Sequence, residues 1–122
     1  MGAIPQPTAA LAAPVNALER EEDPDGRWRR FVNAALGHEY RPLFAGLDRL
    51  VLLKSPSFEA VADWRGEQEA KLRARTGTGM RPDEIPRFVA HYERLTRWIL
   101  QEMPGRADWT VPLARDRSPL PG

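Results

Sequence analysis

One predicted helical face in the middle of this sequence carries polar groups where apolar ones are expected. The pattern predicts a helix over about 56–75, and its stripe consists of Phe58, Val61, Arg65, Gln68 and Leu72. A guanidinium group binds phosphate or carboxylate in a bidentate manner, so Arg65, with Gln68 one turn on and Arg73 two turns on, suits an anion site. The alternative is a solvated ladder of i,i+4 ion pairs through Glu69, each contributing only about 0.3–0.5 kcal/mol.

A second predicted helix, over about 83–103 with Asp83 as its N-cap, carries two more chemically active groups. Its apolar stripe consists of Ile85, Phe88, Val89, Tyr92, Leu95, Ile99 and Met103. Arg94 lies off this stripe, where it either binds a carboxylate or phosphate or is exposed to solvent. His91 is a candidate general base, although a carboxylate suits phosphoryl transfer better. Tyr92, on the stripe, is predicted to pack in the core.

Composition excludes several function classes. The chain has 122 residues, 18 basic and 17 acidic, so its charge lacks the basic excess typical of nucleic-acid or membrane-surface binding. Cysteine is absent, which removes disulfides, thiolate metal sites and cysteine nucleophiles, and the two histidines form no zinc motif. No metal site, nucleic acid or membrane is therefore expected as a partner. No apolar run approaches the roughly 20 residues of a membrane span, and no secretory signal is evident, so a cytoplasmic location is expected.

The remaining elements are predicted from periodicity and turn residues. Residues 1–18 lack a sustained period and are predicted to be loop. Helices are predicted over about 27–37, with Asp25 as N-cap, and over about 40–47. The uninterrupted apolar run 50–53 is typical of a parallel strand buried on both faces, and Ser55 and Pro56 would begin the helix that follows.

A glycine-containing loop over 76–80 and a second strand over 107–113 complete the expected order of elements. That order is helix, helix, strand, helix, helix, strand. Pro112 limits strand pairing and places its strand near an edge or an end of the sheet. Two parallel strands alone leave both edges open, so further strands are expected from outside this sequence.

Three motifs resemble the C-terminal half of P-loop small-molecule kinases of the D-glycerate 3-kinase type. They are Trp64-Arg65 with Gln68-Glu69, then Gly77-x-Gly79-Met80, then His91-Tyr92-Glu93-Arg94-Leu95-Thr96, and the similarity covers about residues 5–117. The resemblance implies an α/β fragment, mostly helical, that holds the last two parallel strands and the lid helices of a three-layer α/β/α kinase. It divides the chain into an extended N-terminal segment 1–26, a lid and acceptor half 27–117 and a tail 118–122.

The resemblance also implies a reaction and further site residues. The family transfers the γ-phosphoryl group of ATP, with Mg²⁺, to a hydroxyl of a small hydroxy acid such as glycerate; pantothenate- and nucleoside-type acceptors stay open as alternatives. Arg65 would be the catalytic lid residue, Gln68 and Arg73 would assist at the phosphates, and Arg117 would lie on the side of the nucleotide base. The acceptor site would draw on Asn16, Arg27, Asn33, His91 and Arg94.

The sequence departs from the family at its start. It contains no GxxxxGK[ST] loop and no acidic residue on a following strand to position magnesium. The chain is therefore expected to represent a truncated kinase that is inactive alone and binds neither ATP nor Mg²⁺ tightly without its nucleotide-binding half. Two alternatives are a non-enzymatic helical interaction module derived from the kinase and one chain of a split kinase.

Overall fold

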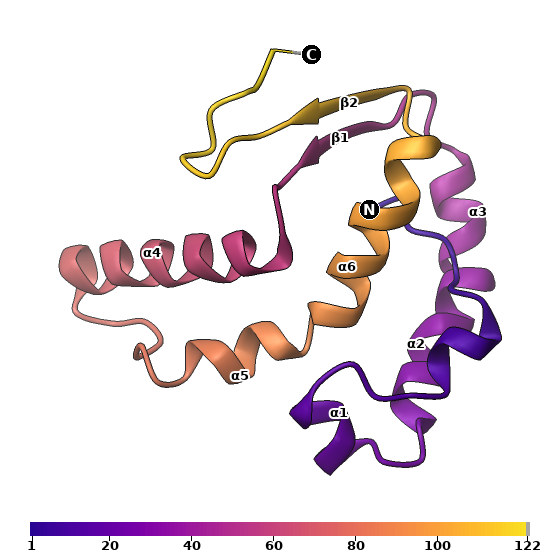
Figure 1. Ribbon diagram of the computed structural model, residues 1–122, viewed down its shortest axis with the longest axis horizontal. Coiled ribbons are helices and arrows are strands. Elements are labelled where there is room, and N and C mark those ends of the chain that lie inside the picture. Colours follow the sequence, from indigo (N-terminus) through magenta and orange to yellow (C-terminus); the bar gives the residue numbers. More distant parts are fainter. Residues whose placement is uncertain (122) are drawn as a thin grey trace.

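The computed structural model describes residues 1–121, which form a mostly helical chain around one pair of strands (Figure 1). The elements in chain order are η1 Thr8–Leu11, α1 Ala17–Glu22, α2 Arg27–Gly37, α3 Tyr40–Ala45, β1 Val51–Lys54, α4 Phe58–Thr76, α5 Ile85–Ala90, α6 Glu93–Glu102, η2 Met103–Gly105 and β2 Trp109–Pro112. None of these helices combines the length and the apolar character that crossing a lipid bilayer requires.

The two strands pair in parallel, as the sequence predicts. Val51 lies opposite Trp109, and Lys54 lies opposite Pro112. Trp109 N–H donates to the Leu50 carbonyl and Leu113 N–H donates to that of Lys54. In a parallel pair of strands, the N–H and C=O groups of alternate residues bond to the partner strand. The backbone groups of Val51 and Leu53 therefore point to the free edge of β1.

The outer edge of β2 differs from the free edge of β1. Pro112 ends β2 at an outward-facing position, where it has no N–H to donate. Its carbonyl accepts a hydrogen bond of 2.8 Å from Leu120 N–H, and Leu113 forms an antiparallel bridge with Pro119. The C-terminal segment therefore closes the β2 edge, whereas the β1 edge is open to a further strand.

The prediction that the first strand is buried on both faces is wrong in this structure. Leu52 is buried, but Val51 and Leu53 are 51% and 64% exposed, and Trp109 on the same face is 65% exposed. The short helix η2 contacts β1 and covers its other face. Apolar side chains thus cover the outer face of a two-stranded sheet, which soluble proteins normally bury.

Helix starts differ from the predicted caps. The N-cap position of α2 is Gly26 rather than Asp25. The Asp23 carboxylate accepts hydrogen bonds from Trp28 N–H at 2.9 Å and Arg29 N–H at 3.1 Å, and Asp25 Oδ1 accepts from Arg27 N–H at 3.3 Å. Ser57, not Ser55, caps α4 by accepting from Ala60 N–H at 3.1 Å. The helix therefore begins after Pro56 rather than at it.

The single long helix predicted over 83–103 is instead two helices. Between α5 and α6, His91 and Tyr92 donate to carbonyls only three residues back, and Asp83 caps neither helix. The Ala90 carbonyl accepts a hydrogen bond of 2.9 Å from the Asn16 side chain. This long-range contact occupies a carbonyl at the helix end and accompanies the break. Tyr92, predicted to be in the core, is 54% exposed and contacts Phe88.

The N-terminal segment is not entirely loop, because α1 lies inside the range 1–26. Side chains from distant elements hold this segment in place. Trp98 Nε1 donates to the Ile4 carbonyl at 2.8 Å, and Arg106 Nη2 donates to the Gly2 carbonyl at 2.8 Å. Buried Arg29 binds the Leu11 carbonyl at 2.7 Å. The segment is thus anchored between α2 and α6.

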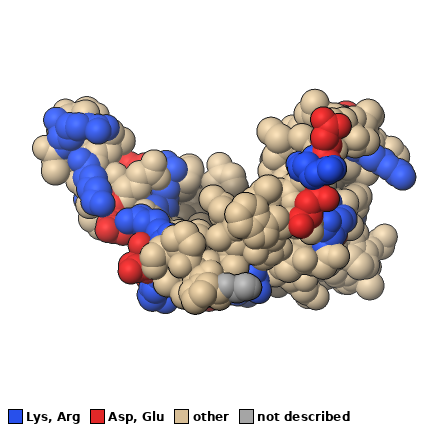
Figure 2. All heavy atoms as spheres, turned by 90° about the horizontal axis from the view of Figure 1, so that it is seen from above, with Lys and Arg blue, Asp and Glu red and all other residues tan. Residues whose placement is uncertain are grey.

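The buried core is small. Phe58, Ile85 and Val89 form a cluster where α4 meets α5. Figure 2 shows two arms separated by an open hollow. Lys and Arg side chains gather on the left-hand arm, which holds the C-terminal end of α4. Most of the large exposed hydrophobic residues lie on the open sheet, on α2 and on or just after α3, so the described chain leaves much apolar surface uncovered.

Candidate functional site

Arg65 lies at the centre of the predicted lid group. It projects from α4 with its guanidinium carbon 4.8 Å from the centre of the Phe88 ring on α5. Its Nη2 donates to Glu69 Oε1 at 2.8 Å, and its side chain is 35% exposed. Its Nε is buried and has no hydrogen-bond partner among residues 1–121. The guanidinium is therefore fixed in place but retains an unused donor.

Glu69 belongs to the motif Trp64-Arg65 with Gln68-Glu69, but the sequence pattern assigned it no role beyond a solvated ion-pair ladder. It is buried, with 5% residual exposure. Its Oε2 accepts a hydrogen bond of 3.0 Å from Met80 N–H, so Glu69 joins Arg65 to the loop that follows α4. The ion pair between Arg65 and Glu69 is the one predicted, but it lies in a buried place rather than on a solvated face.

Gln68 and Arg73 do not join Arg65 in one cluster. Gln68 is exposed on α4. Arg73 turns to the loop, where its Nη1 donates to the Met80 carbonyl. Among these three residues in the described structure, Arg65 alone forms an ion pair with an acidic side chain. The phosphate roles predicted for Gln68 and Arg73 stay predictions.

Arg117 touches the opposite side of α4. Its guanidinium lies 5.9 Å from the centre of the Trp64 ring and its Nη2 is 3.3 Å from Glu67 Oε2. At about 100° per residue, Glu67 and Trp64 face away from Glu69. Trp64 Nε1 also donates to the Arg115 carbonyl at 2.8 Å. The turn after β2 is thus held against α4 on the face opposite Glu69.

The predicted acceptor residues Asn16 and Arg94 lie together. Arg94 Nε donates to both Glu19 carboxylate oxygens, at 2.8 and 3.2 Å, and the other guanidinium nitrogens bind the Ala10 and Ala13 carbonyls. Asn16 caps α1 and donates to Glu93 at 3.1 Å. Burial alone would raise the pKa of Glu19, but hydrogen bonds from Arg94 and the Val15 N–H hold it below its usual range.

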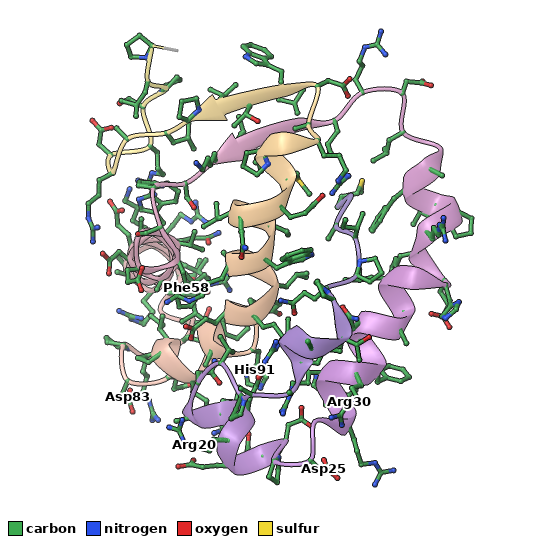
Figure 3. All side chains as sticks on the ribbon, turned by 45° about the vertical axis from the view of Figure 1, so that its right-hand side comes forward. Arg20, Asp25, Arg30, Phe58, Asp83 and His91 are labelled. Atoms are coloured by element: carbon green, nitrogen blue, oxygen red, sulfur yellow. The ribbon has the colours of Figure 1, made fainter. Side chains whose placement is uncertain are left out.

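Asn33 and His91 border the same region. The Asn33 amide pairs with the Gln6 backbone, accepting at 2.7 Å and donating at 3.1 Å. Figure 3 shows His91 at the end of α5, beside the helix that carries Arg20. His91 Nδ1 lies 2.9 Å from the Arg87 carbonyl. Asn33, His91 and Arg94 line one small cavity of about 70 Å³, well below the roughly 300 Å³ of typical ligand pockets.

Arg27 is the predicted acceptor residue that the structure leaves outside this group. It is exposed at the start of α2 and lines a separate open hollow with Trp28 and Phe31. The polar atoms of Asn33 and Arg94 already serve the N-terminal segment, as described above. Their substrate role stays a prediction, and in the described structure they hold residues 6–13 in place.

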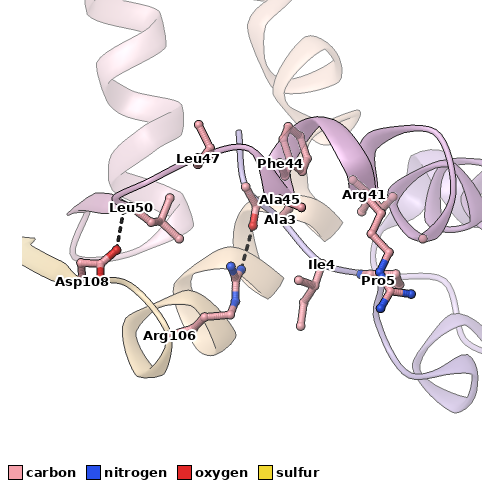
Figure 4. A pocket seen from close by; sticks show the side chains of 13 residues that line it. Ala3, Ile4, Pro5, Arg41, Phe44, Ala45, Leu47, Leu50, Arg106 and Asp108 are labelled. Carbon is pink, nitrogen blue, oxygen red and sulfur yellow. Dashed lines mark hydrogen bonds between the residues drawn. The ribbon is translucent and has the colours of Figure 1, made fainter.

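A larger cavity lies where the sequence predicted no site. Figure 4 shows it between the N-terminal segment, α3 and the start of β1, with a volume of about 470 Å³. Arg41 and Arg106 contribute its positive charge, and Asp108 accepts from Leu50 N–H at 2.7 Å. No periodic pattern marks this cavity, because its walls come from four separate segments.

The described residues fit only part of an ATP and magnesium site. Residues 1–121 contain no group of three or more His, Asp or Glu side chains placed to hold a metal ion. The Arg65 side chain is 35% exposed, so a phosphate oxygen can approach the exposed part of it. The sequence has no GxxxxGK[ST] loop, the motif that cradles a triphosphate in P-loop proteins.

Comparison with known proteins shows a kinase-related region. The chain is 40% identical over 62 residues to the uncharacterized kinase mug58 of Schizosaccharomyces pombe. That match covers 51% of this chain and 22% of the yeast protein, so the chain spans less than a quarter of the relative. No family model and no solved structure matches the chain.

Proposed function

We propose that this chain supplies the lid and the acceptor-binding part of an ATP-dependent small-molecule kinase. The kinase would have a three-layer α/β/α P-loop fold and would transfer the γ-phosphoryl group to a hydroxyl of a hydroxy acid such as glycerate. ATP and Mg²⁺ would be held mainly by a nucleotide-binding part that carries GxxxxGK[ST] on another segment or chain. The relation to a kinase over half of the chain supports the phosphoryl-transfer class.

The open β1 edge is the structural observation that carries the proposal. The free backbone groups of Val51 and Leu53 and the exposed side chains beside them suit a further parallel strand and a covering helix. The β2 edge is closed by Pro112 and residues 119–120. The missing strands would therefore join at β1, which makes β2 an outer strand of the complete sheet.

Arg65 would perform the chemistry contributed by this chain. Phosphoryl transfer depends on positioning and on neutralising charge on the transferring group. The Phe88 ring and Glu69 hold the guanidinium in place, and the side chain is 35% exposed, so a phosphate can approach the exposed part of the group. A fixed, partly buried cation of this kind stabilises a transition-state charge better than a mobile surface arginine.

The test joins the two parts. The DNA preceding the Met1 codon is read for a strand followed by GxxxxGK[ST], and the joined polypeptide is assayed for ATP-dependent phosphorylation of D-glycerate. We expect activity from the joined protein and none from the 122-residue chain. Arg65→Ala should reduce kcat by about 10²–10³-fold, the range for loss of one transition-state donor, whereas exposed Arg75→Ala should leave it nearly unchanged. Turnover by the 122-residue chain, or equal effects of the two variants, would contradict the proposal.

An interaction module is the second candidate. A cavity of about 690 Å³ lies between α2, α3 and α6, and the exposed aromatic residues Trp28, Phe31 and Tyr40 line it. Such a surface favours protein binding. A cooperative thermal transition of the 122-residue chain, together with no encoded or co-purifying GxxxxGK[ST] segment, would favour this candidate. Co-purification of such a segment with restored activity would instead identify a split kinase.

A further inference from the structure

Glu69 is the most deeply buried acidic side chain on the lid helix, and its contacts are divided between two partners. One carboxylate oxygen accepts from Arg65 Nη2 at 2.8 Å, and the other accepts from Met80 N–H at 3.0 Å. Its side chain is 7% exposed. A buried carboxylate needs a compensating charge, and Arg65 is the partner with which it forms an ion pair in the described structure.

The loop after α4 is shaped around this carboxylate. Gly79 adopts φ +138°, and a Cβ there would lie 3.0 Å from Glu69 Oε2. Arg73 also holds this loop, because its Nη1 donates to the Met80 carbonyl. The backbone of the loop therefore approaches the lid helix at Glu69, and the position of the loop depends on what that carboxylate binds.

Only some of the N–H donors of Arg65 have a partner in the described structure. Its Nη2 binds Glu69, while its buried Nε has no partner among residues 1–121. The Phe88 ring supports the guanidinium plane but offers no acceptor. A carboxylate and a phosphate bind a guanidinium through the same N–H donors. A phosphate that reaches this place would therefore compete with Glu69 for the guanidinium of Arg65.

We propose that Glu69 is an internal competitor for the phosphate that Arg65 binds, and that the pair forms a latch on the Gly77–Met80 loop. Without an anion, Glu69 holds Arg65 and the loop against α4. When a polyphosphate takes Arg65, the buried carboxylate loses its counter-charge, and the loop opens so that water can solvate it. The inference rests on the proposed phosphate role of Arg65 and adds a regulatory contact to it.

Binding of inorganic tripolyphosphate to the 122-residue chain tests the competition. Glu69→Gln keeps the side-chain size and can still accept from Met80 N–H, but it removes the competing charge. We expect it to bind tripolyphosphate about five- to tenfold more tightly than the natural chain, within the range of ordinary coupling between sites. Glu67→Gln is the matched control, because it removes one charge from the opposite face of α4. Arg65→Met should abolish the difference.

Hydrogen exchange at the Met80 amide provides a second measurement that needs no variant. Tripolyphosphate should speed this exchange in the natural chain, because the loop opens as Arg65 leaves Glu69. Weaker binding by Glu69→Gln than by the natural chain would identify Glu69 as a positioning residue and overturn the latch. Equal effects of the Glu69 and Glu67 variants, unchanged Met80 exchange, or no tripolyphosphate binding would also overturn it.

The outcomes separate the latch from the proposed kinase function. A working latch with no kinase activity in the joined protein would remove the kinase function and retain an anion-responsive loop. Kinase activity lost in Arg65→Ala, with no difference between the Glu69 and Glu67 variants, would retain the kinase function and remove the latch.

Discussion

At the residue scale, Arg94 joins three segments that are distant in sequence. It forms an ion pair with Glu19 at 2.8 Å and hydrogen bonds with the Ala10 and Ala13 carbonyls, and its side chain is 14% exposed. Arg94→Met should lower the free energy of unfolding by about 2–4 kcal/mol, because it leaves a mostly buried carboxylate without its ion-pair partner. Urea denaturation measures this change. Exposed Arg20→Met is the control and should change stability by no more than about 0.5 kcal/mol; equal losses would contradict the assignment.

Asp23 makes stability depend on pH. Burial favours a raised pKa, but the N–H groups of Trp28 and Arg29, with the Arg29 charge, hold the pKa of Asp23 below its usual range. A carboxyl with a lowered folded pKa stabilises the fold above its unfolded pKa of about 3.9, and this stabilisation is lost as pH falls through the folded pKa. The free energy of unfolding, measured from pH 7 to pH 2, should fall as the solution becomes more acidic. Asp23→Asn should show a smaller loss, with the part due to Glu19 still present; an unchanged profile would exclude Asp23 as its source.

At the element scale, two glycines in the loop after α4 have different reasons for being glycine. Gly77 ends the helix at φ +77° with open space around a Cβ, whereas Gly79 combines φ +138° with close approach to Glu69. Gly77→Ala should cost about 1 kcal/mol for the backbone conformation alone. Gly79→Ala should cost about 2–3 kcal/mol, because strain and the carboxylate contact add. Urea unfolding of the two variants checks the order, and a larger cost at Gly77 would contradict this account.

Local signals predicted the elements better than their ends or their contacts. The helical periodicity over 27–37 predicted α2, and the apolar run 50–53 predicted β1, because periodicity and turn residues act over a few residues. The break between α5 and α6 could not be predicted, because Asn16 reaches the Ala90 carbonyl across 74 residues of sequence. For the same reason the sequence indicated Arg65 but not the buried role of Glu69, which depends on how the loop folds back.

At the scale of the whole molecule, apolar surface exceeds what the described chain can cover. No large side chain is fully buried among residues 1–121, while Val51 and Trp109 are exposed opposite each other on the sheet. Helices lie against one face of the strands only (Figure 1). A surface of this kind either joins another part of the same protein or brings copies together.

The open sheet face predicts concentration-dependent association of the 122-residue chain in solution. Leu53→Lys places a charge on this face at a position that is 64% exposed, so it should change the chain's own stability by no more than about 0.5 kcal/mol. Sedimentation velocity should show association of the natural chain and a shift to monomer in Leu53→Lys. Leu43→Lys, equally exposed but on α3, is the control. If both variants dissociate the chain equally, added charge rather than the sheet face explains the effect, whereas a selective effect of Leu53→Lys assigns the association to the surface where we expect the nucleotide-binding part to join.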